Sequence, residues 1–325
     1  MSRTEYIKVN ARQPEIPLVE IAAKYIKAGE LVAFPTETVY GLGADAFQPA
    51  AVEKIFMAKG RPPAQALLVH VSNREQVYQL AAEVPAIAVQ LMDQFWPGPL
   101  SIILPSRPQV PEIVRAGQAG VGLRMPAHPV ALALIARTGP LAAPSANLYG
   151  HPSPTNAQHV KHDLDGKIAA VLDAGDTGAG LESTLLDLTT ARIRLLRPGG
   201  IKIEEIEQFI GQTIEIAGME PGPAYKTGLR VVLSDDQADF ERKRDEFMRQ
   251  SAHLAVVLID GRPESGKIES KYVYNLQLNG SGMSLYAILR AAVQQGSEIL
   301  LVAPLDPNQA GAALMDRLRR AAAVE

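Results

Sequence analysis

The sequence predicts an α/β protein of two domains, on three observations. Short apolar runs of strand length alternate with stretches in which apolar residues recur at helical spacing. The chain has 325 residues, 47% of them hydrophobic, which is enough for two packed cores. Residues 212–230 are punctuated by Gly and Pro and have little apolar periodicity, which is typical of a linker. We therefore expect one domain at residues 1–211 and a second at residues 231–325.

Helix and strand signals are clear in the first domain. Apolar residues recur at helical spacing over residues 18–26, and Gly29 is a natural C-cap for that helix. Further helices are expected at residues 50–58, 74–83 and 85–95. Strands are expected at residues 31–34, 67–71, 100–104, 141–143, 169–172, 183–188 and 193–196. Strands mixed with helices indicate an α/β domain, in which strand order cannot be read from the sequence.

The second domain has a simpler alternation. Strands are expected at residues 229–233, 254–259 and 299–302, and helices at residues 238–250, 285–293 and 310–321. This pattern predicts a small open parallel sheet covered by helices.

Composition excludes several classes of protein. The chain has no cysteine, which rules out disulfides, thiolate metal sites and a cysteine nucleophile. Its net charge is −3, from 32 basic and 35 acidic residues, whereas a protein that grips a phosphate backbone usually has a basic excess. The N-terminus lacks an apolar signal core, and no apolar run approaches the ~20 residues that span a bilayer. We therefore expect a cytoplasmic protein without membrane contact.

Polar residues gather at two predicted element ends in the first part of the chain. The run from Phe34 to Asp45 is expected to be a loop after a strand, with two threonines, an acid and two glycines. Hydroxyls and free backbone N–H groups in such a loop can hold a small polar ligand. Lys59 and Arg61 follow a helix end and match phosphate oxygens in charge and geometry. The simpler alternatives are a tight connection and solvated surface charge.

Similar groups follow later in the first domain. Ser145 and Asn147 are two apart on an extended segment and point the same way, unless they belong to an ordinary polar turn. Arg124 and Arg197 each end a predicted strand, and His70 ends another. The sequence lacks a Gly-x-x-x-x-Gly-Lys-Ser/Thr loop and a Gly-x-Gly-x-x-Gly motif, so any ATP is not held by a P-loop.

Taken in order, these segments closely resemble the Sua5/YrdC family of threonylcarbamoyl-AMP synthases. The matching stretches are PTETVYGLGADA, KIFMAKGRP, FWPGPLSIIL, RMPAHPVALALI, APSANLYGHPSPT, LESTLLDLT and RLLRPGGI. The stretches LYAILRAA and GAALMDRLRRAA resemble the extra domain of the longer Sua5 branch. The resemblance implies a YrdC-like mixed α/β domain with a large concave cavity, followed by a smaller Rossmann-like α/β domain.

The resemblance also implies roles for individual residues, and it assigns no protein ligand to a metal. Lys59 and Arg61 would be catalytic cations facing the phosphates of ATP. The threonine pocket would be lined by Thr38, His70, Arg124, Ser145 and Ser183. The nucleotide would contact Lys59, Arg61, Gln65, Asn147, Thr155, Arg197 and Tyr225.

The sequence departs from the family pattern at three places. Gln65 and Ala66 stand where the family has Asn-Pro after Lys-Gly-Arg-Pro-x-x. Gly120 stands where a Thr or Ser is frequent, so a nucleotide contact there could come only from the backbone. Of the linker signature of the longer Sua5 branch, only Pro221–Lys226 remains, and the His-Tyr-Ala-Pro sequence that ends it is missing.

The implied reaction joins L-threonine, bicarbonate and ATP into threonylcarbamoyl-AMP and pyrophosphate, with Mg²⁺ beside the nucleotide. A threonylcarbamoyl transferase and tRNA would be the downstream partners. Charge accumulates on phosphoryl oxygens in such a reaction, so positioned cations are the main catalytic requirement. Two alternatives remain: an RNA-binding module with a positive cavity, and a carbamoyltransferase that uses carbamoyl phosphate.

Overall fold

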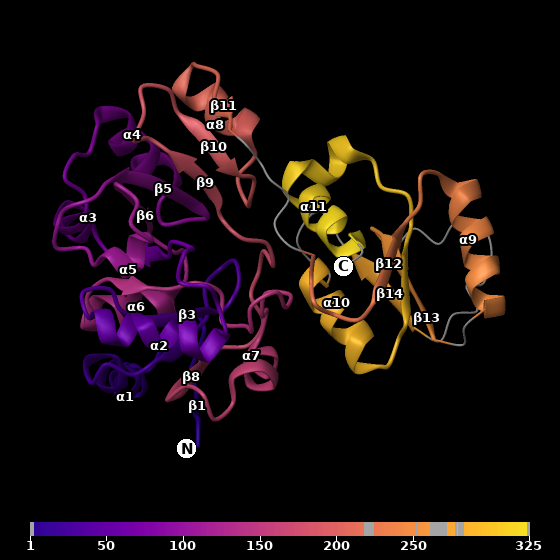
Figure 1. Cartoon of the computed structure of the whole chain (residues 1–325), viewed down its shortest axis with the longest axis horizontal. Coiled ribbons are helices and arrows are strands. Elements are labelled where there is room, and N and C mark those ends of the chain that lie inside the picture. Colours follow the sequence, from indigo (N-terminus) through magenta and orange to yellow (C-terminus); the bar gives the residue numbers. More distant parts are fainter. Residues whose placement is uncertain are drawn as a thin grey trace. The chain divides into compact units, whose positions relative to one another are not determined.

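The chain divides into two compact units. A computed structural model describes residues 3–217, 224–250, 253–260, 272–276, 278 and 283–323. The first unit is Met1–Tyr149 with Ser153–Met219, and the second is Gly150–Pro152 with Glu220–Glu325. Each unit has its own sheet and its own hydrophobic core (Figure 1). The linker positions Gly218, Pro221, Gly222 and Pro223 lie outside the described residues.

The first unit is built on an 11-stranded mixed sheet. Its strand order is β1-β8-β2-β3-β7-β4-β6-β5-β9-β10-β11. The strands are β1 (Glu5–Lys8), β2 (Val32–Phe34), β3 (Gly41–Asp45), β4 (Leu68–His70), β5 (Leu100–Pro105), β6 (Gly120–Arg124), β7 (Leu141–Ala142), β8 (Ala170–Asp173), β9 (Thr184–Asp187), β10 (Arg194–Arg197) and β11 (Glu215–Ile216). The seven strands given by range for this unit are all present, β6 is the strand expected to end at Arg124, and β1, β3 and β11 are additional.

Helices cover both faces of this sheet. They are α1 (Ile16–Lys27), α2 (Pro49–Lys59), α3 (Arg74–Leu80), α4 (Ala86–Phe95), α5 (Glu112–Arg115), α6 (Pro129–Thr138), α7 (Ala157–Leu164) and α8 (Ile203–Ile210). Figure 1 shows α1, α2 and α6 gathered near β3 and β8, and α1 packs on α6. Strand β2 lies between two cores: Val32 and Phe34 pack with α1 and α6, whereas Ala33 packs on the opposite face.

The segment after β2 differs from the expected long loop. Only residues 35–40 form a loop, and β3 then runs back antiparallel to β2, with Val32 opposite Gly43. The two glycines are strand residues because the Phe34 ring lies across them. A Cβ on Gly43 would lie 2.8 Å from Phe34 Cε1, and one on Gly41 would lie 3.3 Å from Phe34 Cζ. The glycines therefore make room for an aromatic ring, a constraint that the local sequence does not reveal.

The second unit has the predicted small parallel sheet. Its strands are β12 (Arg230–Leu233), β13 (Leu254–Ile259), β14 (Tyr272–Leu276) and β15 (Ile299–Val302), in the order β12-β15-β13-β14. Its helices are α9 (Gln237–Gln250), α10 (Leu285–Gln294) and α11 (Pro307–Ala322). All pairs are parallel, which confirms the expectation, and β14 is the one strand of this sheet that the sequence did not indicate.

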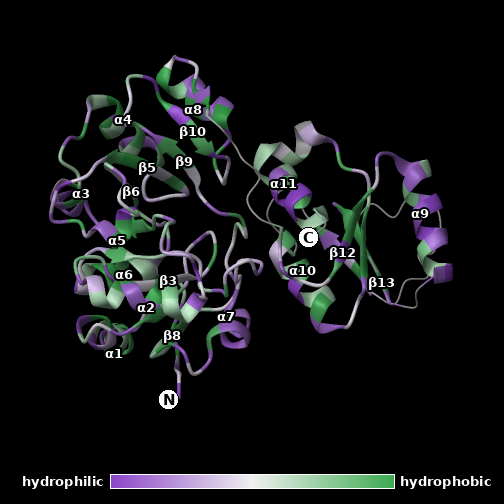
Figure 2. Ribbon diagram, in the orientation of Figure 1, coloured by the Kyte–Doolittle hydropathy of each residue, from purple (hydrophilic) through white to green (hydrophobic). Residues whose placement is uncertain are grey.

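The two faces of the second sheet are covered by different helices. Figure 1 shows α9 on one face and α10 with α11 on the other. In Figure 2 the strands β12 and β13 are green and much of α9 is purple. Phe240 and Phe247 are the buried residues of α9, and they pack with Leu301 of the sheet. The charged remainder of α9 is therefore a solvated face, as a helix with mixed charges is expected to present.

The second unit also includes Gly150–Pro152, which are far in sequence from its other residues. The backbone oxygen of Gly150 accepts a hydrogen bond from the Lys226 N–H at 2.8 Å. The Pro152 oxygen accepts from Arg290 Nε at 3.2 Å and from Nη2 at 2.6 Å. Arg290 is 7% exposed, so a buried guanidinium of α10 holds this short segment.

Among the described residues, no helix combines the length and the apolar character that a membrane crossing requires.

The packing of Phe34 on Gly43 can be tested by mutation. We expect Gly43→Ala to destabilise the first unit by about 1–3 kcal/mol, because the added methyl overlaps the ring. Trp96 is the chain's single tryptophan and lies in this unit, so its fluorescence during denaturation reports unfolding there. Phe34→Leu should relieve the overlap, so the double variant should be less destabilised than the sum of the single ones. Additive losses would contradict this explanation.

Candidate functional site

Predicted site residues meet where neighbouring strands end. His70 is the last residue of β4 and Arg124 is the last residue of β6. The two strands are parallel, and His70 and Arg124 are register partners. Carboxyl ends of parallel strands lie at the same sheet edge, so these two side chains start from adjacent positions.

Arg124 is the centre of the predicted threonine pocket. It is 3% exposed, and its Nη1 donates to Thr38 Oγ1 at 3.0 Å while its Nε donates to the Gly98 oxygen at 3.2 Å. Its Nη2 lies 2.7 Å from Glu37 Oε1, an ion pair with an acid that the sequence analysis did not assign to the site. The guanidinium thus joins the loop at residues 35–40 to the turn at Gly98.

The loop that carries Thr38 is fixed by its own hydroxyls. Thr36 Oγ1 donates to the Val39 oxygen at 2.7 Å, and it accepts from the N–H groups of Thr38 and Val39 at 3.1 and 3.2 Å. The Thr36 and Thr38 hydroxyls are also hydrogen-bonded to each other at 2.8 Å. Two threonines in this spacing therefore build a rigid turn as well as a polar surface.

His70 is neutral at physiological pH. The side chain is fully enclosed, and burial, helped by the positive charge of Arg124, holds the pKa of His70 well below its usual range. The ring meets Phe34 edge to face, with centroids 6.2 Å apart. A neutral imidazole offers one donor and one acceptor, which suits a hydroxyl or a carboxylate ligand.

Lys59 is buried and holds the segment that contains Ser145 and Asn147. It is the last residue of α2 and is 3% exposed. Its Nζ donates to the Ser145 oxygen at 2.5 Å and to the Asn147 oxygen at 2.6 Å. The carboxyl end of a helix also favours a cation. Lys59 therefore positions this segment in addition to any contact with a ligand.

Arg61 and Gln65 lie in the turn between α2 and β4. Arg61 Nη2 donates to the Ala66 oxygen at 3.1 Å, and burial lowers the pKa of Arg61. Gln65 Nε2 donates to Tyr149 Oη at 2.7 Å, and the Tyr149 N–H donates to the Lys59 oxygen at 2.8 Å. Gln65 thus ties its turn to Tyr149, a residue that the sequence analysis did not single out.

Ser183 and Arg197 form a third cluster. Arg197 ends β10, and its Nη2 donates to Ser183 Oγ at 3.0 Å and to the Ser183 oxygen at 2.9 Å. The Ser183 hydroxyl is also 2.7 Å from that of Ser101, and both serines are buried. The sequence analysis found Ser183 and Arg197 but missed Ser101, because nothing distinguishes it within the apolar strand β5.

The two remaining predicted residues lie in different units. Thr155 is buried in the first unit, and its hydroxyl is 3.1 Å from His159 Nδ1. Tyr225 belongs to the second unit, where its hydroxyl is 3.0 Å from that of Tyr286. Arg320 lies over the Tyr225 ring, with Cζ 4.7 Å from the centroid. The assignment of Tyr225 to a nucleotide stays a prediction.

Backbone contacts connect the clusters of the first unit. The Tyr40 N–H donates to the Pro154 oxygen at 2.9 Å, and the Tyr40 oxygen accepts from the Ala146 N–H at 2.8 Å. The Gly180 N–H donates to the Thr38 oxygen at 3.0 Å, and the Thr177 N–H to the Thr155 oxygen at 2.8 Å. The loop at residues 35–40 therefore contacts the segment at residues 146–154 and the segment that begins at Gly180 and leads to Ser183.

Buried polar atoms without a hydrogen bond concentrate in this region. Within the described part of the chain, they include Glu37 Oε2, His70 Nδ1 and Arg61 Nε, whereas Glu37 Oε1 and Arg124 Nη2 have their ion pair with each other and no further hydrogen bond. Leaving such atoms unsatisfied is costly, so native proteins rarely do so outside functional sites. A polar ligand that supplies the missing partners would bind here.

Two further points concern metal ligands and the glycine at position 120. Among the described residues, no group of three or more His, Cys, Asp or Glu side chains is arranged to hold a metal ion. At Gly120 a Cβ would lie 2.6 Å from Ile103 Cγ2, so glycine is required there by packing in the sheet.

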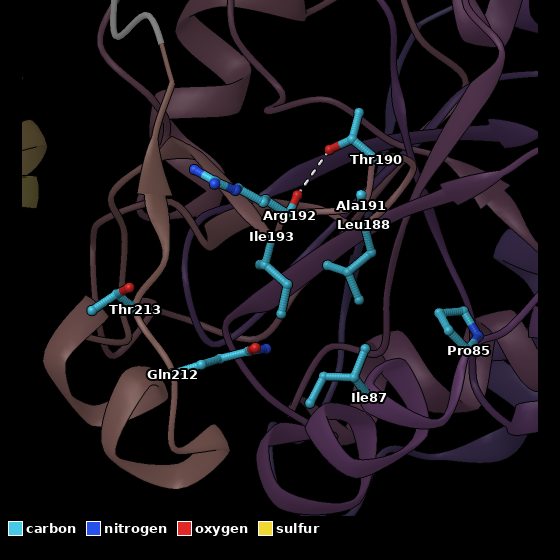
Figure 3. A pocket seen from close by; sticks show the side chains of 9 residues that line it. All are labelled: Pro85, Ile87, Leu188, Thr190, Ala191, Arg192, Ile193, Gln212 and Thr213. Atoms are coloured by element: carbon cyan, nitrogen blue, oxygen red, sulfur yellow. Dashed lines mark hydrogen bonds between the residues drawn. The ribbon is translucent and has the colours of Figure 1, made fainter.

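A separate cavity of ≈ 280 Å³ contains none of the predicted residues. Figure 3 shows Pro85 and Ile87 on one side of it, the turn between β9 and β10 above, and Gln212 and Thr213 opposite. Arg192 is the one ionisable side chain among its labelled residues, and Thr190 Oγ1 donates to the Arg192 oxygen at 2.8 Å. This lining offers no arrangement of acids, bases and nucleophiles for catalysis.

Comparison with known proteins identifies the family. Residues 24–199 match the Sua5/YciO/YrdC family model, described as "Telomere recombination", and residues 201–323 match the model "Threonylcarbamoyl-AMP synthase, C-terminal domain". This chain belongs to the Sua5/YrdC family. A threonylcarbamoyl-AMP synthase of Pyrococcus abyssi is 39% identical over 324 residues, covering 93% of each chain. A Bacillus subtilis protein of the same name is also 39% identical, covering 94% of this chain and 93% of its own.

Solved structures agree with this Sua5/YrdC assignment. The structure of P. abyssi Sua5 complexed with L-threonine is 37% identical, with a TM-score of 0.85, and 98% of each chain is covered. Escherichia coli YciO is 21% identical with a TM-score of 0.58, and this likeness concerns the fold alone. The mixed α/β fold and the two-domain Sua5 architecture expected from the sequence are confirmed.

The neutral state of His70 predicts a pH dependence of stability. Below about pH 6.5 an unfolded histidine binds a proton that folded His70 does not, so stability falls as the pH falls. We expect His70→Gln to reduce the loss of thermal stability between about pH 7.5 and about pH 5, followed by Trp96 fluorescence. His162→Gln, at a histidine whose side chain is 62% exposed, serves as the matched comparison. Equal losses in wild type and His70→Gln would show that His70 is not held neutral.

Proposed function

We propose that this chain is a threonylcarbamoyl-AMP synthase, which converts L-threonine, bicarbonate and ATP into threonylcarbamoyl-AMP and pyrophosphate. The observation that carries this proposal is the cluster at Arg124: neutral His70 lies at the adjacent strand end, and Thr38 and Glu37 contact the guanidinium from the loop at residues 35–40. Such a group of donors and acceptors matches an amino acid with a side-chain hydroxyl. The names of the full-length relatives support the same activity.

The proposed roles follow the two halves of the reaction. Thr38, His70, Arg124, Ser145 and Ser183 would bind L-threonine. ATP would be bound by Lys59, Arg61, Gln65, Asn147, Thr155, Arg197 and Tyr225. Of these, Lys59 and Arg61 would be the catalytic cations.

The chemistry requires positioned charge more than a nucleophilic side chain. The threonine amine attacks bicarbonate with loss of water, or CO₂ with loss of a proton, to give a carbamate. A carbamate oxygen then attacks the α-phosphorus of ATP, and the bond to the bridging oxygen breaks as pyrophosphate leaves. Cations that face the developing charge on the phosphoryl oxygens lower this barrier. Carbamates hydrolyse readily, so a site whose polar groups are buried also protects the intermediate.

Mg²⁺ would enter as part of the substrate MgATP. The described residues provide no cluster of metal ligands, whereas Mg²⁺ at nucleotide sites keeps several waters and is held largely by phosphates. We propose a cytoplasmic protein that acts as a nucleotidyltransferase and whose product passes to a threonylcarbamoyl transferase for tRNA modification.

Pyrophosphate release tests the proposed reaction. The assay supplies ATP with L-threonine and bicarbonate, separately and together, and we expect release only when both are present. ATP-independent RNA binding without turnover would instead indicate a binding module. Activity with carbamoyl phosphate would indicate the carbamoyltransferase.

Lys59→Ala and Arg61→Ala test the catalytic cations. We expect each to reduce turnover at saturating ATP by roughly a hundredfold, because each removes a cation that faces phosphoryl charge. Lys54→Ala is the matched control, since Lys54 is on the same helix but pairs with Glu30 and is half-buried. Trp96 fluorescence during thermal unfolding should show that all three variants fold. Normal turnover in folded Lys59→Ala and Arg61→Ala would remove these residues from the mechanism.

A further inference from the structure

Glu37 is an acid at the candidate site that the assigned roles do not use, and its side chain is partly exposed while its carboxylate oxygens are buried. Its Oε1 lies 2.7 Å from Arg124 Nη2, and Arg124 is 3% exposed. Apart from this ion pair, neither carboxylate oxygen has a hydrogen-bond partner within the part of the chain that the structure describes. A buried carboxylate normally accepts several hydrogen bonds, so the oxygens of Glu37 can accept further hydrogen bonds from a ligand.

The position of Glu37 is fixed by the loop around it. Its neighbours Thr36 and Thr38 are hydrogen-bonded to each other, and its own backbone oxygen accepts from the Ala179 N–H at 2.8 Å. The charged and titratable groups that face it come from different elements: Arg124 ends β6, and His128 caps α6, where burial lowers the pKa of His128 against the opposing effect of Glu37. The carboxylate is therefore held beside a guanidinium in a rigid setting.

We propose that Glu37 binds the α-ammonium of the amino-acid substrate while Arg124 binds its carboxylate. An amino acid is a zwitterion, and a buried carboxylate and guanidinium side by side present the complementary pair of charges. Substrate entry would replace one ion pair by two, and its ammonium would supply donors that the oxygens of Glu37 lack. This inference rests on the proposed function and makes Glu37 a specificity-determining residue of that site.

The alternative is that Glu37 only positions Arg124. The two roles separate with ligands that carry one charge each. (R)-3-Hydroxybutyrate has the carboxylate and hydroxyl of threonine but no amine, whereas L-threoninamide keeps the ammonium and lacks the carboxylate. A residue that binds the ammonium affects threonine and threoninamide, while a residue that positions Arg124 affects threonine and hydroxybutyrate.

The experiment measures binding of the three ligands to the full chain by calorimetry or ligand-observed NMR. We expect Glu37→Gln, which keeps the shape and removes the charge, to weaken threonine and threoninamide binding by roughly tenfold to a hundredfold. Hydroxybutyrate binding should not weaken. Glu30→Gln, at an acid paired with Lys54 on another part of the unit, is the matched control and should change none of the three.

Three results would overturn the assignment of Glu37. Unchanged threonine binding in Glu37→Gln would remove it from the site. Equal weakening of threonine and hydroxybutyrate, with threoninamide unaffected, would reduce Glu37 to a positioning residue for Arg124. Loss of ATP binding and thermal stability together would show a structural role, and Glu37→Asp, which keeps the charge, should then fail to restore threonine binding. Failure of the proposed function looks different, because the wild-type chain itself would then not bind threonine.

Discussion

Burial of the Arg124 guanidinium is the constraint on which the candidate site depends. A charge with 3% exposure must be satisfied by the protein, and its three partners come from two segments distant in sequence. Thr38 and Glu37 approach from the loop after β2, and the Gly98 oxygen from the turn before β5. The same charge disfavours protonation of His70 on the neighbouring strand. One guanidinium therefore ties the loop after β2 to the strand ends and adds to the effect of burial on His70.

Much of the fold and site could be predicted because the signals are local. Apolar runs such as residues 67–71 have the length and composition of buried strands, and a polar residue at the end of such a run lies at a sheet edge. This reasoning placed His70, Arg124 and Arg197 at strand ends, where the structure has them. The parallel sheet of the second unit followed from regular alternation. The resemblance then joined residues that local patterns could not connect.

The remaining features depend on contacts between distant segments. Strand β3 was missed because its glycines look like loop residues in the sequence. They are needed in a strand only because the Phe34 ring packs against them. The pairing of Glu37 with Arg124 joins the loop after β2 to the end of β6, two strands that are not neighbours in the sheet, and no periodicity reports it. Tyr149 and Ser101 were missed for the same reason, since each is defined by a partner far along the chain. Lys59 was predicted only as a cation that faces a ligand, but its Nζ also donates to two backbone carbonyl oxygens.

The membership of Gly150–Pro152 in the second unit has a consequence for modularity. The chain passes between the units after Tyr149, after Pro152 and again after Met219, so a single cut cannot separate them. A gene fragment that ends before residue 220 would still encode Gly150 and Pro152, but not Lys226 and Arg290, which donate to their carbonyl oxygens. Recombination that exchanged the second unit for another would have to provide new donors for those two oxygens. Loss or exchange of the second unit therefore changes the surroundings of these two oxygens.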